Sequence, residues 1–117
     1  MNHRITIKVV DFIGSHLCIS AEDGQKVFDK ILPLLQADKN ITISFEHIDT
    51  IISLFLNVAI GQLYGSLSEE KIKALVKVEG LSMDDMELLK QVVDNAKKYY
   101  ANPKSYDSAW ESEEDDV

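Results

Sequence analysis

The sequence predicts an α/β fold, in which a sheet is packed against helices. Two kinds of pattern lead to this class: short segments that alternate polar and apolar residues, and longer segments whose apolar residues recur at helical spacing. The two kinds alternate along the chain, and strands that alternate with helices pair in parallel through right-handed crossovers. With 117 residues, the chain is long enough for one domain with a buried core.

The first part of the chain predicts two strands and a helix. Arg4–Val10 (RITIKVV) alternates and is rich in β-branched residues, Asp11–Gly14 is typical of a turn, and His16–Ile19 is expected to be a short strand. Ser20 is placed to cap a helix, because the residue three positions later is acidic. We expect Pro33 to bend this helix or to end it early. The buried face of the helix is predicted from its apolar residues: Val27, Phe28, Ile31, Leu32 and Leu35.

The middle of the chain predicts a second clear strand followed by an apolar helix. Ile41–Glu46 (ITISFE) alternates as a strand. Ser53–Tyr64 is apolar on nearly every side, so we expect a deeply packed helix, and Gly65 is expected to end it.

The last elements are a helical turn from Ser68, a strand over Ala74–Val78 and a helix that begins with a cap at Ser82. Asn102-Pro103 is expected to close this helix. The apolar face of the helix is formed by six residues: Met86, Leu88, Leu89, Val92, Val93 and Ala96.

The domain is predicted to span residues 1–102, followed by an acidic tail over residues 103–117. The tail carries −5 of the total net charge of −8 and has too few apolar groups to fold alone, so we expect it to be solvated and disordered. Tyr106 and Trp110 lie four residues apart among its acidic side chains. They are interpreted either as part of a frayed tail or as a short docking motif.

Charge and composition exclude several function classes. The 102 residues before the tail carry the remaining −3, and neither part has the basic stripe that a nucleic-acid or anionic membrane partner needs. No segment approaches the roughly 20 apolar residues that span a bilayer, and the N-terminus lacks a signal-peptide pattern, so we expect a cytoplasmic protein. The single cysteine, Cys18, excludes an internal disulfide. No glycine-rich phosphate loop is present, and we expect no cofactor.

Ser53 is a hydroxyl at the start of the apolar helix, and it has two interpretations. As a cap, its side-chain oxygen would accept a hydrogen bond from a free backbone N–H of the first turn. If it is exposed at a strand-to-helix turn, it is also a site for phosphorylation, because the N-terminal end of a helix favours a phosphate.

A narrow stripe of small and polar residues follows Ser53 along the predicted helix. Asn57 and Gly61 lie four and eight residues after it, and Tyr64 lies close by, whereas the rest of the helix is apolar. The stripe is either the solvent face or a docking face for a protein partner, since small residues let another backbone approach.

A polar cluster of Glu46, His47 and Asp49 precedes Ser53. Solvation of a loop is the simple interpretation of these side chains. Their spacing matches no metal motif, and no nucleophile elbow or oxyanion loop accompanies them, so we expect neither a metal site nor a catalytic site.

The order of elements and the Ile41–Gly65 segment resemble the STAS domain, the fold of anti-sigma factor antagonists and of the cytoplasmic part of sulfate transporters. The chain is most similar to the bacterial STAS-like family of uncharacterised proteins, over about residues 4–101. The resemblance is carried by ITISFEHIDTIIS and LFLNVAIGQLYG, then by SEEKIKALVKVEGLS and NAKKYYANP. It implies a STAS-like fold, with a mixed sheet packed against helices.

In the antagonists, the first serine of an Asp-Ser-Ser-Gly-Leu run is phosphorylated by a partner kinase of the GHKL ATPase type. Ser53 matches that serine, whereas Ile52, Leu54 and Phe55 replace the aspartate, the second serine and the glycine. The resemblance implies a non-enzymatic regulatory module that binds a protein partner, such as a GHKL-type ATPase or kinase, and is switched by phosphorylation. We expect the partner to bind five residues: Asp49, Ser53, Asn57, Gly61 and Tyr64.

Two other functions remain open. The first alternative is a structural or oligomerising subunit, in which Ser53 only caps its helix. The second is binding or hydrolysis of a small ligand at the turn that holds Glu46, His47 and Asp49.

Overall fold

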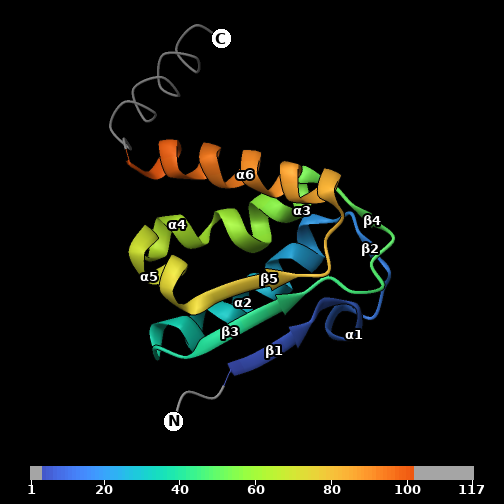
Figure 1. The fold of residues 1–117 in the computed structure, drawn as a ribbon, viewed down its shortest axis with the longest axis horizontal. Helices are drawn as coiled ribbons and strands as arrows, with labels where there is room; N and C mark the ends of the chain where they lie inside the picture. Colours follow the sequence, from blue (N-terminus) through green and yellow to red (C-terminus); the bar gives the residue numbers. More distant parts are fainter. Residues whose placement is uncertain (1–3, 102–117) are drawn as a thin grey trace, which may run out of the picture.

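Three parallel strands form the main sheet, in the order β1-β3-β5 (Figure 1). The computed structural model describes residues 4–101, and in it β1 is Arg4–Lys8, β3 is Asn40–Ser44 and β5 is Val76–Glu79. Ile41 of the central strand pairs with Ile5 on one side and Val76 on the other. The predicted α/β class, with a sheet packed against helices, is therefore confirmed.

The two faces of this sheet differ because successive side chains of a strand point to opposite sides. One face is aliphatic and belongs to the core, to which Ile7, Ile41 and Ile43 contribute. The other face is polar: Thr42 of the central strand pairs with Thr6 on one side and Lys77 on the other, and Ser44 pairs with Lys8 and Glu79 in the same way. The alternation in the sequence therefore correctly separates the core face from the outer face.

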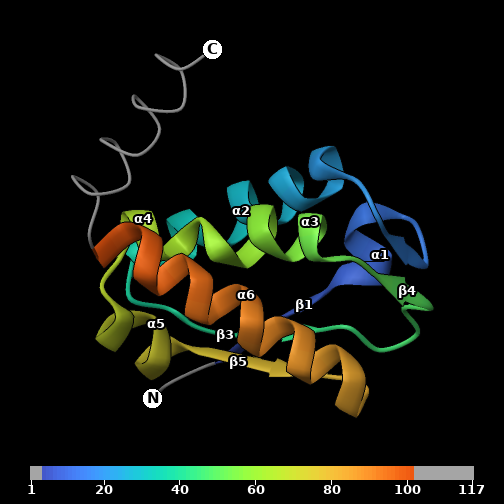
Figure 2. The ribbon, with the colours of Figure 1, turned by 90° about the horizontal axis from the view of Figure 1, so that it is seen from above.

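Two long helical segments cover the aliphatic face. The first is α2 (Ala21–Gln36), and the second runs through α3 (Ser53–Leu56), the π-helical segment η1 (Asn57–Gly61) and α4 (Leu63–Ser66). We call this second segment the 53–66 helix. Both lie on the same side of the strands, and α6 (Met83–Ala101) packs against the 53–66 helix (Figure 2).

A second, two-stranded parallel sheet lies at one end of the molecule (Figure 1). It pairs β2 (Leu17–Cys18) with β4 (Thr50–Ile51), the latter just before the 53–66 helix. The short strand predicted over His16–Ile19 is thus confirmed. β4 was not predicted, because two residues are too few to show an alternation.

Several predicted boundaries are wrong. Val9 begins a short helix, α1 (Val9–Ile13), in place of a continued strand and a turn, and Gly14 ends it in the left-handed conformation with φ of 70°. Gly65 lies inside α4 and does not end the helix. The glycine is needed for packing instead, because a Cβ at this position would lie 2.5 Å from the ring of Tyr100.

Two other elements differ in length from the prediction. α2 continues past Pro33 to Gln36: the proline lacks only its own N–H, and its carbonyl still accepts a hydrogen bond from the Ala37 N–H at 3.0 Å. The strand predicted from Ala74 begins at Val76, since α5 (Glu69–Leu75) continues to Leu75.

The predicted serine caps at Ser20 and Ser82 are confirmed, and Ser68 caps α5 in the same way. The hydroxyl of Ser20 accepts a hydrogen bond from the backbone N–H of Asp23 at 3.1 Å. Ser68 and Ser82 accept equivalent bonds at 3.1 Å. Each serine satisfies one of the free N–H groups that a helix leaves in its first turn.

Four expectations concern residues outside the described range. These are the domain end at residue 102, the helix closure at Asn102-Pro103, the acidic tail over 103–117, and the interpretation of Tyr106 and Trp110. Within the described range, no helix is both long and apolar enough to cross a membrane.

Candidate functional site

Ser53 is exposed at the junction of a strand and a helix. β4 ends at Ile51, Ile52 is extended with φ of −114° and ψ of 160°, and Ser53 begins α3. The side chain of Ser53 lies on the surface. The structure therefore places this hydroxyl where the sequence predicts it, at the entrance of a largely buried helix.

The capping interpretation of Ser53 is wrong. The cap position is one residue earlier, at Ile52, whose carbonyl accepts the hydrogen bond from Leu56 N–H at 3.3 Å. A residue inside the first turn does not have the extended backbone that lets a side chain reach back to free N–H groups. Within residues 4–101, the Ser53 hydroxyl makes no hydrogen bond.

Exposed apolar residues surround Ser53. The side chains of Ile19, Ile52 and Leu54 are 45%, 36% and 48% exposed. Ile19 and Ile52 directly follow the paired strands β2 and β4, and the N–H of Ile52 donates to the Cys18 carbonyl at 3.1 Å. We call Ile19, Ile52, Ser53 and Leu54 the Ser53 surface. Exposed apolar residues that gather at one place are typical of interaction sites.

The predicted stripe along the helix does not form one continuous surface. Asn57 is exposed, but Gly61 is buried beneath α6, where a Cβ would lie 3.7 Å from Cβ of Ala96. Tyr64 is half-buried and faces the last turn of α6. The helix α6 of the chain itself therefore covers the lower part of the stripe.

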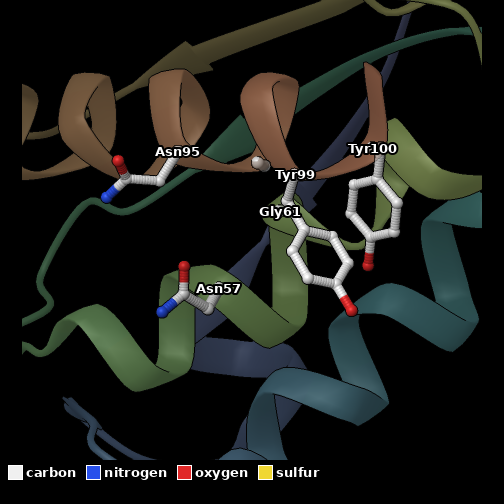
Figure 3. Close-up of a pocket in the computed structure, with 6 residues that line it drawn as sticks. Asn57, Gly61, Asn95, Tyr99 and Tyr100 are labelled. Carbon is white, nitrogen blue, oxygen red and sulfur yellow. The ribbon is translucent and has the colours of Figure 1, made fainter. Parts of the chain in front are cut away.

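A groove lies between the 53–66 helix and α6, with a cavity volume of about 340 Å³ (Figure 3). Its lining combines two carboxamides, two phenol rings and two small residues: Asn57, Gly61, Asn95, Ala96, Tyr99 and Tyr100. Figure 3 shows the ring of Tyr99 reaching from α6 toward the 53–66 helix. The rings of Tyr99 and Tyr100 meet edge-on, with centroids 4.8 Å apart.

A π-helical segment forms one wall of this groove. The N–H of Gln62 donates to the carbonyl of Asn57, five residues earlier, at 3.1 Å. The side-chain amide of Gln62 donates to the carbonyl of Val58 at 2.8 Å. Such segments are rare and occur frequently at functional sites.

Tyr64 lies beside an ion pair that joins α5 to α6. The ammonium of Lys97 is 2.7 Å from a carboxylate oxygen of Glu69. This hydrogen bond lowers the pKa of Glu69 and raises the pKa of Lys97. Burial raises the pKa of Tyr64, although Lys97 acts in the opposite direction, so the phenol stays protonated at neutral pH.

The loop that holds Glu46, His47 and Asp49 is fixed by backbone contacts. His47 has a φ of 66°, its carbonyl lies 2.8 Å from Nδ1 of His16, and the N–H of Asp49 donates to the His16 carbonyl at 2.8 Å. Asp49 is exposed to solvent. Among residues 4–101, no three His, Cys, Asp or Glu side chains gather as metal ligands do.

Sequence reasoning missed the residues that α6 contributes to the groove. Asn95 and Tyr99 belong to no recognisable motif in the sequence. Their shared face, at positions i and i+4, is a detectable signal. That signal becomes meaningful only once the 53–66 helix is known to pack there.

One comparison with known proteins gives a match. The model of a family described as "STAS-like domain of unknown function (DUF4325)" matches residues 23–86. The matched segment runs from the first turn of α2 to the first turn of α6 and includes Ser53, Asn57 and Gly61. No curated protein and no solved structure matches the chain.

Proposed function

The chain belongs to this family of STAS-like domains of unknown function, and on that premise we propose that it is a non-enzymatic regulatory module that binds a protein partner at the Ser53 surface. The observation that supports the proposal most directly is an exposed hydroxyl, without a hydrogen bond among the described residues, next to three exposed aliphatic side chains. Aliphatic side chains supply the binding energy of such a surface when a partner removes them from water.

Phosphorylation of Ser53 is the proposed switch. A phosphate adds about −1.5 to −2 charges at pH 7, and here it would stand among Ile19, Ile52 and Leu54. A partner that covers these residues would then have to bury an unpaired charge, so it would be released. We propose a kinase of the GHKL ATPase type as the partner, following the resemblance at Ser53.

The state of the nucleophilic side chains supports a function other than catalysis. Burial raises the pKa of the Cys18 thiol to about 12, so the reactive thiolate is scarce at neutral pH. Within the described part of the chain, Ser53 and His47 do not form the hydrogen bond by which a histidine activates a serine.

The binding experiment uses a purified GHKL-type ATPase from the same genome. Leu54→Lys and Ser53→Glu are expected to weaken binding about tenfold or more, because each places a charge in an apolar contact. Met86→Lys is the matched control, since Met86 and Leu54 are both 48% exposed. Equal binding by all variants would contradict the proposed surface.

The switch is tested separately by incubating the chain with the ATPase and ATP and mapping the modified residues by mass spectrometry. Phosphate on Ser53, absent from a Ser53→Ala variant, is the expected result. Phosphate on other serines only would exclude the switch and leave the binding surface in place.

A second candidate function is self-association, which the same exposed aliphatic residues favour. In an oligomerising subunit, Leu54→Lys would convert a dimer to a monomer in sedimentation analysis. A monomeric wild-type chain at high concentration would exclude this function.

A further inference from the structure

We infer that the groove between the 53–66 helix and α6 binds an aromatic side chain, and that its occupant is Trp110 from residues 102–117 of this chain. Three properties carry the inference: the chemistry of the lining, the place where the described chain ends, and the charge of a nearby lysine on α6.

The lining suits an indole ring. It has no charged side chain, and it offers two tyrosine rings at one end with Gly61 and Ala96 between the helices. Rings of this kind pack edge-to-face with another aromatic side chain. Within residues 4–101, the carboxamides of Asn57 and Asn95 make no hydrogen bond, so an oxygen is available to accept from an indole N–H.

The chain leaves the described structure beside the groove. α6 ends at Ala101, and Tyr99 and Tyr100 lie in its final turn. Trp110 follows nine residues later, so an extended chain allows it to lie up to about 30 Å from Ala101. Asn95 is only about 9 Å from Ala101 along the helix axis.

A lysine of α6 that lies outside the lining of the groove matches the acidic segment in charge. Lys98 lies three residues after Asn95, on the same helix face, and it is exposed. Lys97 is paired with Glu69, but Lys98 has no ion pair among the described residues. The residues that flank Trp110 include Asp107, Glu111 and Glu113, so the docked segment would place carboxylates near Lys98.

A second, more apolar groove is less accessible to this segment. It lies at the start of α6, has a volume of about 540 Å³, and is lined by Met83 and Met86 among others. Met86 is 15 residues before Ala101, which is roughly 22 Å along the helix axis. To reach it, Trp110 would need about three quarters of its full reach of about 30 Å, whereas Asn95 requires about a third.

Occupancy of the groove has a regulatory consequence. Asn57 lies one helical turn after Ser53, so a docked segment would cover part of the surface that a partner of the Ser53 surface would contact. This competition rests on the proposed function, but the docking of Trp110 does not.

Trp110 is the only tryptophan in the chain, so its fluorescence reports its environment directly. The experiment measures emission and acrylamide quenching of the full chain, with the peptide 102–117 as the solvent-exposed reference. We expect emission at a shorter wavelength and quenching about twofold or more weaker than in the peptide, because the groove shields the indole from water. The values should not depend on protein concentration.

Two variants fill the groove, and a third is the control. Asn57→Phe and Asn95→Phe, both at exposed positions, are expected to move the quenching to the value of the peptide. Met86→Phe adds the same side chain at an exposed position of the other groove and should leave Trp110 shielded. Circular dichroism checks that each variant is folded. The comparison of the wild-type chain with the peptide does not depend on the variants.

Three outcomes would overturn the inference. Peptide-like quenching in the full chain would show that the segment does not dock. Release of Trp110 by Met86→Phe alone would place it in the other groove. Shielding that disappears on dilution would assign the occupant to a second copy of the chain. Because no partner is present, these outcomes are independent of the binding experiment at the Ser53 surface.

Discussion

At the scale of single residues, the serines of this chain are used in two ways. Ser20, Ser68 and Ser82 each satisfy a backbone N–H at a helix start, whereas Ser53 begins a helix without doing so. The difference arises because a cap must lie just before the helix in extended conformation, and at the 53–66 helix that position is held by Ile52.

Replacing two of these serines by alanine should separate their roles. Ser20→Ala is expected to lower the free energy of unfolding by about 1 kcal/mol, because the N–H of Asp23 loses its partner. Ser53→Ala is expected to change it by less than about 0.5 kcal/mol, as is usual for an exposed residue without a partner. Urea unfolding monitored by circular dichroism measures both; equal losses would mean that Ser53 stabilises its helix after all.

At the scale of elements, the 53–66 helix is packed between α2 and α6, and a glycine lies at each of these contacts. A Cβ at Gly24 of α2 would lie 2.9 Å from the carbonyl oxygen of Phe55 and 3.0 Å from Cβ of Val58. A Cβ at Gly61 would meet only ordinary contacts at 3.7 Å. The first glycine is therefore required for the approach of two backbones, whereas the second leaves space that forms part of the groove.

Alanine at the two glycines is expected to have opposite effects. Gly24→Ala should destabilise the fold by about 1 kcal/mol or more, because overpacking against a backbone exceeds the helix propensity that alanine adds. Gly61→Ala should be neutral or stabilising by up to about 1 kcal/mol. Guanidinium unfolding of the two variants provides the comparison, and a stabilised Gly24→Ala would show that α2 and the 53–66 helix can separate at little cost.

At the scale of the whole molecule, the helices cover only one face of the main sheet. The central strand β3 is paired on both sides, whereas β2 and β4 form a ladder of two residues at one end of the molecule. Stability is therefore concentrated around β3, while the end that holds the Ser53 surface rests on few hydrogen bonds.

Hydrogen exchange should reveal this difference. The amides of β3 are expected to exchange only through global unfolding, because they are buried in a ladder with two neighbours. The N–H of Ile52, bonded to the Cys18 carbonyl beyond the short ladder, should exchange through local opening and therefore faster. Similar protection at both sites would indicate that β2 and β4 open only with the core.

The sequence by itself determined the class of the fold, the core face of each main strand and the helix caps at Ser20 and Ser82. These features depend on neighbours within a few residues: alternation for Ile41 and Ile43, and a hydroxyl three residues before an N–H for Ser20. The position of Ser53 at a helix start was predictable from the same local patterns, but its exposure was not.

The tertiary structure alone decided the ladder of β2 and β4, the π-helical segment and the separation of the Ser53 stripe into an exposed Asn57 and a buried Gly61. Each depends on contacts between residues far apart in the chain: Cys18 with Ile52, and Gly61 with Ala96. Local patterns carry no information on such contacts, because the energy that selects them comes from packing whole elements against one another.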